Sequence, residues 1–246
     1  MPEFGRLSRE RVPYTTPFVA PLYPPPPWPL PDAQILQTLF EIDRDVALDW
    51  LPPGLAKPVP PYAQILIVRY PESPVGPFAM ASQLVVCRSQ TRARGYALQS
   101  VVDGPPAALA ALREIWGFPA RPGRVRLDVA DAAIEGSVAD ENGRTVSVVS
   151  MRDLHPADPE HIHYDPILAP RLTPPVQDEK PPAVLEMTQV DPDYTIKQCR
   201  LGAGSISYPE SSEGYPWHLL QPRNMIATTY TVSDTSFPWA RYLVEW

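Results

Sequence analysis

The sequence predicts an α+β protein that is mainly antiparallel β, built as a barrel or sandwich with a few short helices. Many short apolar runs with a two-residue period alternate with turn residues along the 246 residues of the chain, a pattern typical of antiparallel sheets. Only two segments have a helical pattern. No strand–helix–strand rhythm appears, so a doubly wound parallel sheet is not expected.

Composition indicates a folded chain with long proline-rich connections. Hydrophobic residues make up 44% of the sequence and charged residues 20%, which suits one large β-rich domain or two smaller ones. There are 35 prolines against 12 glycines, and they cluster at residues 13–31, 52–61 and 166–182. Proline ends helices and is excluded from central strands, so these clusters are predicted to be arms and loops. We expect an N-terminal proline-rich arm (residues 1–30) and one domain (residues 31–246).

Charge and cysteine content limit the partners and the compartment. The formal net charge of -7 and pI of about 5.1 argue against nucleic acid and anionic membrane surfaces. No run approaches the roughly 18 apolar residues of a membrane span, and the N-terminal residues lack a signal-peptide core. Cys87 and Cys199 lie in apolar strand-like segments, where reduced buried thiols are expected and one disulfide is the alternative. These features predict a cytoplasmic protein.

The apolar patterns place the elements along the chain. Asp43 is the expected N-cap of a helix over residues 44–50, and a second helix is expected over residues 105–112. Asn142-Gly143 predicts a tight hairpin. Residues 89–95 are expected to form an exposed turn, and residues 156–182 a connection. The expected strands are 33–42, 62–70, 78–88, 96–102, 124–130, 133–139, 144–151, 184–190, 194–201, 205–208 and 225–232.

The middle of the chain carries the most specific motif, Arg-Glu-Ile-Trp-Gly-Phe-Pro-Ala-Arg at residues 113–121. This run resembles the signature of the acetoacetate decarboxylase family, in which an Arg-Glu-x-Trp/Phe-Gly-Tyr/Phe-Pro run is followed by two lysines. Weaker, pattern-level similarity covers most of residues 31–246. The resemblance implies the family's β-barrel or cone, and it also implies a homo-oligomer. Here the two lysine positions are Ala120 and Arg121.

That departure excludes the reaction that the resemblance would otherwise imply. In the family the first lysine forms a Schiff base with a ketone, and a lowered lysine pKa activates it. Alanine has no amine, and arginine, with a pKa above about 12, is deprotonated at pH 7 to no more than about one part in 10⁵. Of the three lysines, Lys57 and Lys180 lie in proline-rich loops, which leaves Lys197 as the only candidate substitute.

Other pocket positions of the family also differ. By an ungapped alignment, the resemblance places a pocket arginine of the family at Gln34 and two pocket glutamates near Ile65 and Met80. The resemblance therefore implies an apolar cavity with few polar groups. We predict Arg121 and Glu114 as the catalytic residues, although Arg113 and Glu114 could instead hold the turn as an ion pair. The predicted substrate-binding residues are Gln34, Ile65, Met80, Trp116 and Ala120.

Other chemistries have weaker support. His161, His163 and Asp165 alternate along the chain and could converge on a metal, but they lie in a proline-rich connection, where ordinary loop residues are the simpler interpretation. No Gly-x-Ser-x-Gly elbow or glycine-rich phosphate loop is present in the sequence. We therefore predict neither a metal nor a cofactor.

Two hypotheses of function follow. The first is a small-molecule enzyme that acts without an imine, by cyclisation, dehydration, rearrangement or non-covalent decarboxylation of a polyketide-like or terpenoid-like molecule. The second is a non-catalytic binding protein or assembly subunit that keeps the barrel.

Overall fold

The computed structural model describes residues 6, 8–89, 92–175 and 181–245. In this part of the chain, thirteen strands form one sheet and two α-helices, α1 (Arg44–Trp50) and α2 (Pro106–Glu114), pack against it. The strands are β1 (Trp28–Glu41), β2 (Tyr62–Tyr70), β3 (Phe78–Ser89), β4 (Arg92–Asp103), β5 (Ala120–Pro122), β6 (Arg124–Val129), β7 (Ala133–Ala139), β8 (Thr145–Pro156), β9 (Ile167–Thr173), β10 (Val184–Val190), β11 (Asp193–Ser207), β12 (Asn224–Phe237) and β13 (Arg241–Glu245).

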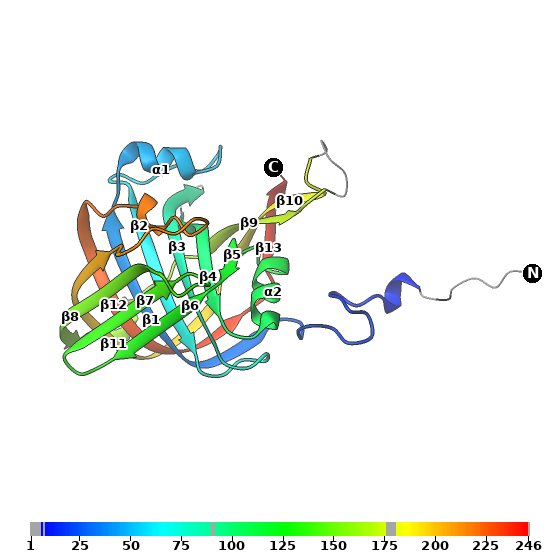
Figure 1. Ribbon diagram of the computed structural model, residues 1–246, viewed down its shortest axis with the longest axis horizontal. Coiled ribbons are helices and arrows are strands. Elements are labelled where there is room, and N and C mark those ends of the chain that lie inside the picture. The colour runs from blue at the N-terminus through cyan, green and yellow to red at the C-terminus, as the bar shows by residue number, and fades with distance from the viewer. Residues whose placement is uncertain (1–5, 7, 90–91, 176–180, 246) are drawn as a thin grey trace, which may run out of the picture.

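The sheet is antiparallel except around β4. Its order is β13-β10-β9-β4-β3-β2-β1-β12-β11-β8-β7-β6, with the short β5 paired to β4 outside this path. β5 and β9 both run parallel to β4. The sheet curves strongly, so that β6 comes to pack across β2 and β4, and an N-terminal arm extends from the end at which α2 lies (Figure 1). The mainly antiparallel α+β fold predicted from the sequence is confirmed.

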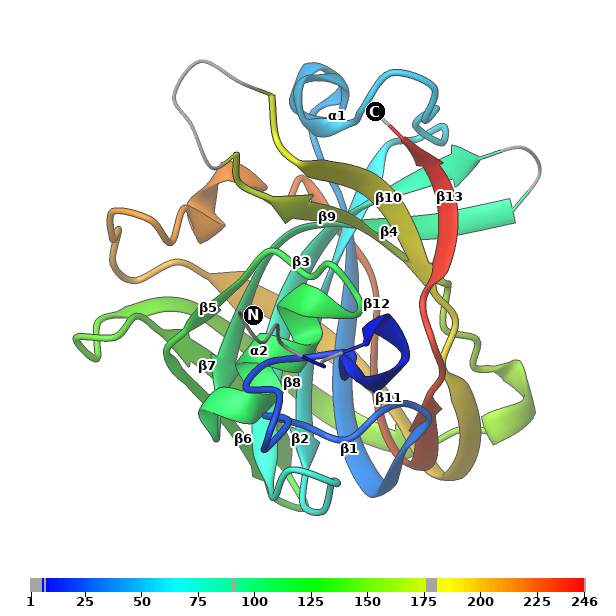
Figure 2. The same ribbon diagram turned by 90° about the vertical axis from the view of Figure 1, so that its right-hand side faces the viewer.

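Alternation along the central strands divides the buried side chains between two faces, because successive residues of a strand point to opposite sides. The first core lies on the face that α2 and the arm cover, as Figure 2 shows from that side. Its large members are the aromatic residues Trp28, Tyr70, Phe78, Trp116 and Phe237. The second core lies on the opposite face, where β6–β8 pack over the sheet. It includes Leu36, Phe40, Ile65, Val149 and Trp217.

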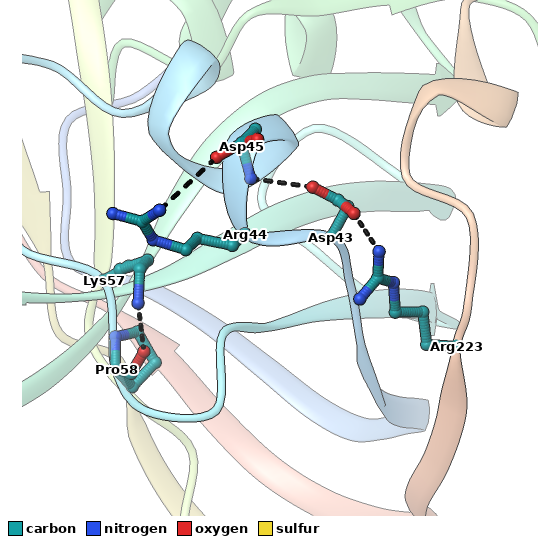
Figure 3. A network of polar contacts seen from close by, with 6 residues as sticks. All are labelled: Asp43, Arg44, Asp45, Lys57, Pro58 and Arg223. Carbon is teal, nitrogen blue, oxygen red and sulfur yellow. Dashed lines mark hydrogen bonds and ion pairs between the residues drawn. The ribbon is translucent and has the colours of Figure 1, made fainter.

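Helix α1 begins where the sequence predicts. The carboxylate of Asp43 accepts a hydrogen bond from the backbone N–H of Asp45 at 2.8 Å and forms an ion pair with Arg223 (Figure 3). These contacts lower the pKa of Asp43, with the backbone hydrogen bond as the largest cause. The cap therefore joins the start of α1 to the residue that precedes β12, and it anchors the segment containing Trp50.

Helix α2 ends in a turn that requires glycine. Gly117 has a φ of +72°, which is accessible to glycine at little cost. A Cβ atom at this position would lie 2.9 Å from the backbone nitrogen of Arg171 in β9. The turn is closed by the backbone N–H of Phe118, which donates to the carbonyl of Leu112 at 3.0 Å. The chain then enters β5 directly, so this turn sets the directions of residues 120 and 121.

Most predicted elements are present, and the differences are longer strands and strands, including β9 and β13, that the sequence did not predict. Both helices form, and β7 and β8 form a hairpin across residues 140–144. Residues 156–182 are not a continuous connection, because β9 forms inside them by pairing with β10 and β4. The expected turn at 89–95 is largely strand, except that residues 90 and 91 lie outside the described part. Residues 194–208, expected as two strands, belong mostly to the single strand β11, since neighbouring strands supply its hydrogen bonds through a glycine-containing stretch.

The glycine in this turn can be tested against a second glycine. Gly117→Ala should lower the free energy of unfolding by more than the about 1–2 kcal/mol that a left-handed conformation costs an L-residue, because its Cβ would also press on β9. Gly143→Ala is the matched control, since Gly143 has a φ of +84° but a Cβ atom there would meet no other atom within 4 Å. Urea unfolding of both variants would measure the difference. Equal losses would contradict a packing role for Gly117.

Candidate functional site around Arg121

Trp116 fixes the turn that leads to the site. Its indole ring is fully buried and makes edge contacts with Trp28 and Phe237, at ring-centroid distances of 5.1 and 5.4 Å. The indole N–H donates to the carbonyl of Pro238 at 2.7 Å, and the backbone carbonyl of Trp116 accepts from the hydroxyl of Thr188 at 2.9 Å. The polar group of this side chain is thus satisfied while the ring packs on two other aromatics, which makes its position well determined.

Ala120 follows the turn and lies in the first core. It pairs with Ser100 across the parallel β4–β5 ladder and is only 2% exposed. Its cluster contains the aromatic side chains of Trp116 and Phe118, and Met80 belongs to the same cluster. Ala120 lines none of the cavities described below. The position at which the family signature has its first lysine is therefore filled here by packed apolar side chains.

Arg121 lies on the other side of the β5 backbone, at a cavity of about 300 Å³. The wall is mostly apolar, and its polar members are two glutamines and one serine from neighbouring strands. The lining consists of Trp50, Gln83, Leu98, Gln99, Ser100, Val101, Pro119, Arg121, Gly214, Tyr215, Pro216 and Leu219. Among these described residues there is no carboxylate, histidine, cysteine or lysine.

The guanidinium group of Arg121 is placed by a ring and a glycine. It lies 5.8 Å from the ring centroid of Tyr215, within the range of a cation–π contact. Gly214 has a φ of +81°, and a Cβ atom there would lie 2.7 Å from Nη1 of Arg121. The absence of a side chain at Gly214 thus makes room for the guanidinium. Within the described part of the chain, Arg121 makes no ion pair.

Tyr215 is held from behind the cavity. Its hydroxyl lies 2.7 Å from the carbonyl oxygen of Pro122 and 3.0 Å from the Oε1 atom of Glu141. Burial raises the pKa of Tyr215 to about 12, with further contributions from Glu141, and the positive charge of Arg121 partly offsets the increase. The phenol therefore stays protonated near neutral pH and donates away from the cavity. Its contribution to the site is the face of the ring.

Two glutamines provide the polar part of the lining. The Nε2 atom of Gln83 donates to the backbone carbonyl of Trp217 at 2.9 Å, and the Nε2 atom of Gln99 donates to Oε1 of Gln83 at 2.6 Å. Gln83 is fully buried and Gln99 is half-buried. Ser100 is engaged with Ser82 at 2.8 Å between their hydroxyl oxygens. Of these three polar side chains, only Gln99 is partly exposed to solvent.

The other predicted substrate-binding residues do not join Arg121 in this cavity. Gln34 and Ile65 lie on the face of the second core, because Gln34 shares a strand face with Thr38, which pairs with Ile65. Met80 and Trp116 belong with Ala120 to the first core. The Oε1 atom of Gln34 is buried with no hydrogen-bond partner in the described structure.

Glu114 lines a different cavity, of about 780 Å³, between α2 and the arm. Its carboxylate accepts hydrogen bonds from the hydroxyls of Tyr23 at 2.5 Å and Thr15 at 3.2 Å. Burial and the carboxylate of Glu114 raise the pKa of Tyr23 to about 12. Arg113 donates to the carbonyl of Ala120 at 3.4 Å and, in the described structure, forms no ion pair with Glu114. Glu114 thus fastens the arm to α2, and it does not share a cavity with Arg121.

Lys197 is poorly suited to act as a substitute nucleophile. Its ammonium group forms ion pairs with Asp32 at 2.7 Å and Asp234 at 2.6 Å on an exposed surface. Hydrogen bonds to Asp234 and then Asp32 raise the pKa of Lys197, which stabilises the charged form rather than the free amine. Lys57 is half-buried and donates to the carbonyl of Pro58, and Lys180 lies outside the described residues.

The alternating histidines do not form a metal cluster. His161 ends a short 3₁₀ helix, and burial raises the pKa of Asp165 while the charge of nearby His163 partly opposes that rise. Among the described residues, no group of three histidine, cysteine or acidic side chains is arranged to hold a metal ion. Cys87 and Cys199 are both buried with free thiols, as expected from their apolar strands.

The residues that the sequence did not single out are Gln83, Gln99, Gly214 and Tyr215. Gln83 and Gln99 pair directly across the β3–β4 ladder, so a prediction of that register would have brought the two amides together. Gly214 and Tyr215 belong to the loop between β11 and β12. No local pattern in that loop indicates that it returns to β5, which lies more than ninety residues away in the sequence.

Similarity to known proteins extends along nearly the whole chain. The sequence model of the family described as acetoacetate decarboxylase (ADC) matches residues 11–245. The chain belongs to the acetoacetate decarboxylase family. Within the described residues, no helix is both long and apolar enough to cross a membrane.

Individual relatives are distant in sequence but similar in fold. The chain is 24% identical to Decarboxylase DEC1 of Cochliobolus heterostrophus over 236 residues, which cover 92% of each protein. Its fold is similar to that of the acetoacetate decarboxylase from Legionella pneumophila, with a TM-score of 0.85, 21% identity and coverage of 100% of this chain and 99% of the other. It is also similar to the enduracididine biosynthesis enzyme MppR, solved with the condensation product of pyruvate and imidazole 4-carboxaldehyde. That TM-score is 0.77, with 18% identity and coverage of 96% and 97%.

Restoring the family's lysine tests how tightly position 120 is packed. Ala120→Lys should lower the free energy of unfolding by about 4–5 kcal/mol more than Ala120→Met at pH 7, because a buried lysine must lose its proton to avoid a buried charge. The pKa of this lysine would be depressed in the folded state, so the unfolded chain binds the extra proton and stability rises with pH. The excess loss should shrink to about 1 kcal/mol near pH 9.5.

Urea unfolding of Ala120→Lys and Ala120→Met at the two pH values would measure this excess. The methionine variant controls for added volume, since it has a long side chain but no charge. A pH-independent difference would mean that the lysine stays charged and solvated, and that position 120 opens onto a wet cavity.

Proposed function

We propose that this chain is a small-molecule enzyme that works without an imine and releases carbon dioxide from a β-keto acid bound in the Arg121 cavity. Membership of the acetoacetate decarboxylase family and the relative named as a decarboxylase support an enzyme of this reaction class. The observation that carries the proposal is a guanidinium without an ion-pair partner among the described residues, at a mostly apolar cavity whose described lining holds no acid or base.

Loss of carbon dioxide from a β-keto acid suits such a lining. The bond between the α carbon and the carboxylate carbon breaks, and its electron pair forms the double bond of an enolate. Carbon dioxide leaves, the ketone oxygen takes the negative charge, and water later supplies a proton to the α carbon. No side chain has to remove a proton in this sequence, so a site without a general base can perform it. The other candidate reactions, dehydration and cyclisation, usually need one.

In this mechanism the guanidinium of Arg121 contacts the ketone oxygen of the substrate. A guanidinium that bound the carboxylate would stabilise the charge that disappears in the reaction and would slow it. At the ketone oxygen the same guanidinium stabilises charge that grows toward the transition state, which is the condition for catalysis. Arg121 is exposed to solvent in the structure, and a ligand that fills the cavity against Leu98 and Val101 would remove water from the guanidinium and strengthen this interaction. Tyr215 and Gly214 hold the guanidinium in position.

The same lining also favours the second candidate, a binding protein without catalysis. A site with one cation, two amides and no titrating acid or base binds an anion whether or not a reaction follows. The two candidates differ only in turnover. In either case we propose a small-molecule ligand and no nucleic acid, in keeping with the net charge of -7. A homo-oligomer is proposed as well, since Trp239 and Tyr242 are exposed and line the same cavity as Tyr14 of the arm. The location that we propose is the cytoplasm.

Replacing the cation should test the catalytic step. Arg121→Met should lower kcat for release of carbon dioxide by about 10²- to 10³-fold, the usual effect of removing one oxyanion-stabilising donor. Arg121→Lys should retain part of the rate, because an ammonium keeps the charge but not the planar fork. Arg124→Met is the matched control, since Arg124 is an exposed arginine of β6 outside this cavity.

The assay would follow carbon dioxide released from short 3-oxo acids, with thermal unfolding of each variant as a check on folding. Binding without any release of carbon dioxide by the parent protein would favour the binding protein. An unchanged rate in a folded Arg121→Met variant would remove Arg121 from the mechanism.

Chemical trapping separates this mechanism from the family's imine reaction. Borohydride added with a ketone or β-keto acid should leave the protein unmodified by intact-mass analysis, because Ala120 has no amine and Lys197 is held protonated by two carboxylates. Retention of activity after such treatment would agree. A reduced adduct mapped to Lys197 would instead show that amine chemistry has moved to that residue.

A further inference from the structure

We infer that Gln99 selects the ligand of the Arg121 cavity by presenting a fixed hydrogen-bond acceptor, so that the cavity takes a β-keto acid carrying a hydroxyl or enol group away from its ketone. This inference rests on the proposed function of the same cavity and names its substrate class. It follows from a series of hydrogen bonds that runs from a backbone carbonyl through the side-chain amides of Gln83 and Gln99 and fixes the orientation of both amides.

The series of hydrogen bonds starts at a backbone carbonyl, which can accept a hydrogen bond but cannot donate one. The backbone carbonyl of Trp217 receives a hydrogen bond from Nε2 of Gln83 at 2.9 Å. This partner of the Gln83 amide is a carbonyl oxygen, which requires a donor. The NH₂ group of Gln83 must therefore face Trp217, and its Oε1 atom must face the other way.

The orientation is passed on to Gln99. Because Oε1 of Gln83 accepts, the group that approaches it at 2.6 Å must be the NH₂ group of Gln99. A flipped Gln99 would place two carbonyl oxygens against each other. The Oε1 atom of Gln99 therefore remains as the acceptor of this side chain, and no described residue donates to it. Gln83 is fully buried, so the relay cannot rearrange without breaking bonds inside the second core.

The surroundings give this acceptor its selectivity. Gln99 lines the cavity together with the apolar side chains of Leu98, Val101 and Leu219. A ligand that fills the space with apolar atoms removes water from the Gln99 carbonyl and leaves it unpaired, which is unfavourable. A ligand with an O–H group in reach restores the bond. Arg121 donates to an anionic or enolising oxygen of the ligand, and Gln99 accepts from a hydroxyl group of the ligand. The site therefore recognises two ligand oxygens, one that accepts a hydrogen bond and one that donates.

Size limits the class further. A cavity of about 300 Å³ lies at the small end of the range for ligand sites. It suits a short hydroxylated keto acid or a single ring that carries a carboxylate and a hydroxyl, rather than a long acyl chain.

Binding measurements can test this selectivity without any turnover. The probes are the three isomers of hydroxybenzoate, the three corresponding methoxybenzoates and benzoate, which vary the separation of the two oxygens at constant charge. Calorimetric titration of the parent protein should show at least one hydroxybenzoate binding about tenfold to a hundredfold more tightly than its methoxy partner. In Gln99→Met, which keeps the length but not the carbonyl, this ratio should fall to near one.

Leu98→Met is the matched control from the same wall, and it should change the affinity for both members of a pair equally. A second arm compares release of carbon dioxide from 5-hydroxy-3-oxohexanoate and 3-oxohexanoate, with kcat/KM expected to favour the hydroxylated acid in the parent protein and in Leu98→Met but not in Gln99→Met.

The outcomes separate this inference from the proposed function. Release of carbon dioxide with no preference for hydroxylated probes, or a preference that survives in Gln99→Met, would overturn the role of Gln99 and leave decarboxylation standing. A hydroxyl preference without any release of carbon dioxide would support Gln99 in a binding protein and count against the enzyme. Failure of every probe and both keto acids to bind would remove the cavity as a site and overturn both proposals.

Discussion

The packing of Trp116 is the interaction on which the functional part of this fold depends. The ring joins the start of β1, through Trp28, to the end of β12, through Phe237. The indole N–H donates to the carbonyl of Pro238, and the backbone carbonyl of Trp116 accepts from the hydroxyl of Thr188. The turn that follows is closed against β9 at Gly117. Four separate parts of the chain, β1, the end of β12, β10 and β9, thus fix the point at which β5 begins. Alternation along a strand then sends residue 120 to one face and residue 121 to the other.

This geometry explains how the signature turn can form with an alanine at position 120. The Arg-Glu-x-Trp-Gly-Phe-Pro run serves the turn, and the turn is needed for the fold whatever stands at position 120. In this chain the side of position 120 has been closed by aromatic packing, and Arg121 faces a cavity of its own. Glu114, which also belongs to the run, is engaged by Tyr23 and Thr15 of the arm. Retention of the signature therefore reflects the architecture, and the chemistry depends on the residues that follow it.

The sequence predicted the fold better than the site, for a physical reason. Helix caps, the Asn-Gly hairpin and the period-two strands are local signals, and Asp43, Gly143 and β2 lie where those signals place them. The site depends on long-range register. Residue spacing alone could not show that Gln34 and Met80 point to opposite faces, because a one-residue shift in alignment reverses a strand's facing. Nor could it show that Gly214 and Tyr215 return to β5, since that contact is formed by a loop without a periodic pattern.

The ionisable side chains that line the Arg121 cavity limit the reactions that it can catalyse. The ionisable groups of the described lining are the Arg121 guanidinium and the Tyr215 phenol, whose pKa is raised to about 12 and whose hydroxyl faces Pro122 and Glu141. The phenol does not exchange its proton readily near neutral pH, and the described lining holds no carboxylate, histidine, cysteine or lysine. A reaction carried out here must be driven by charge stabilisation and placement, and the bound molecule must supply its own leaving group. A β-keto acid does so, since carbon dioxide departs with no base to assist it. The fixed amides of Gln83 and Gln99 then decide which such molecule fits.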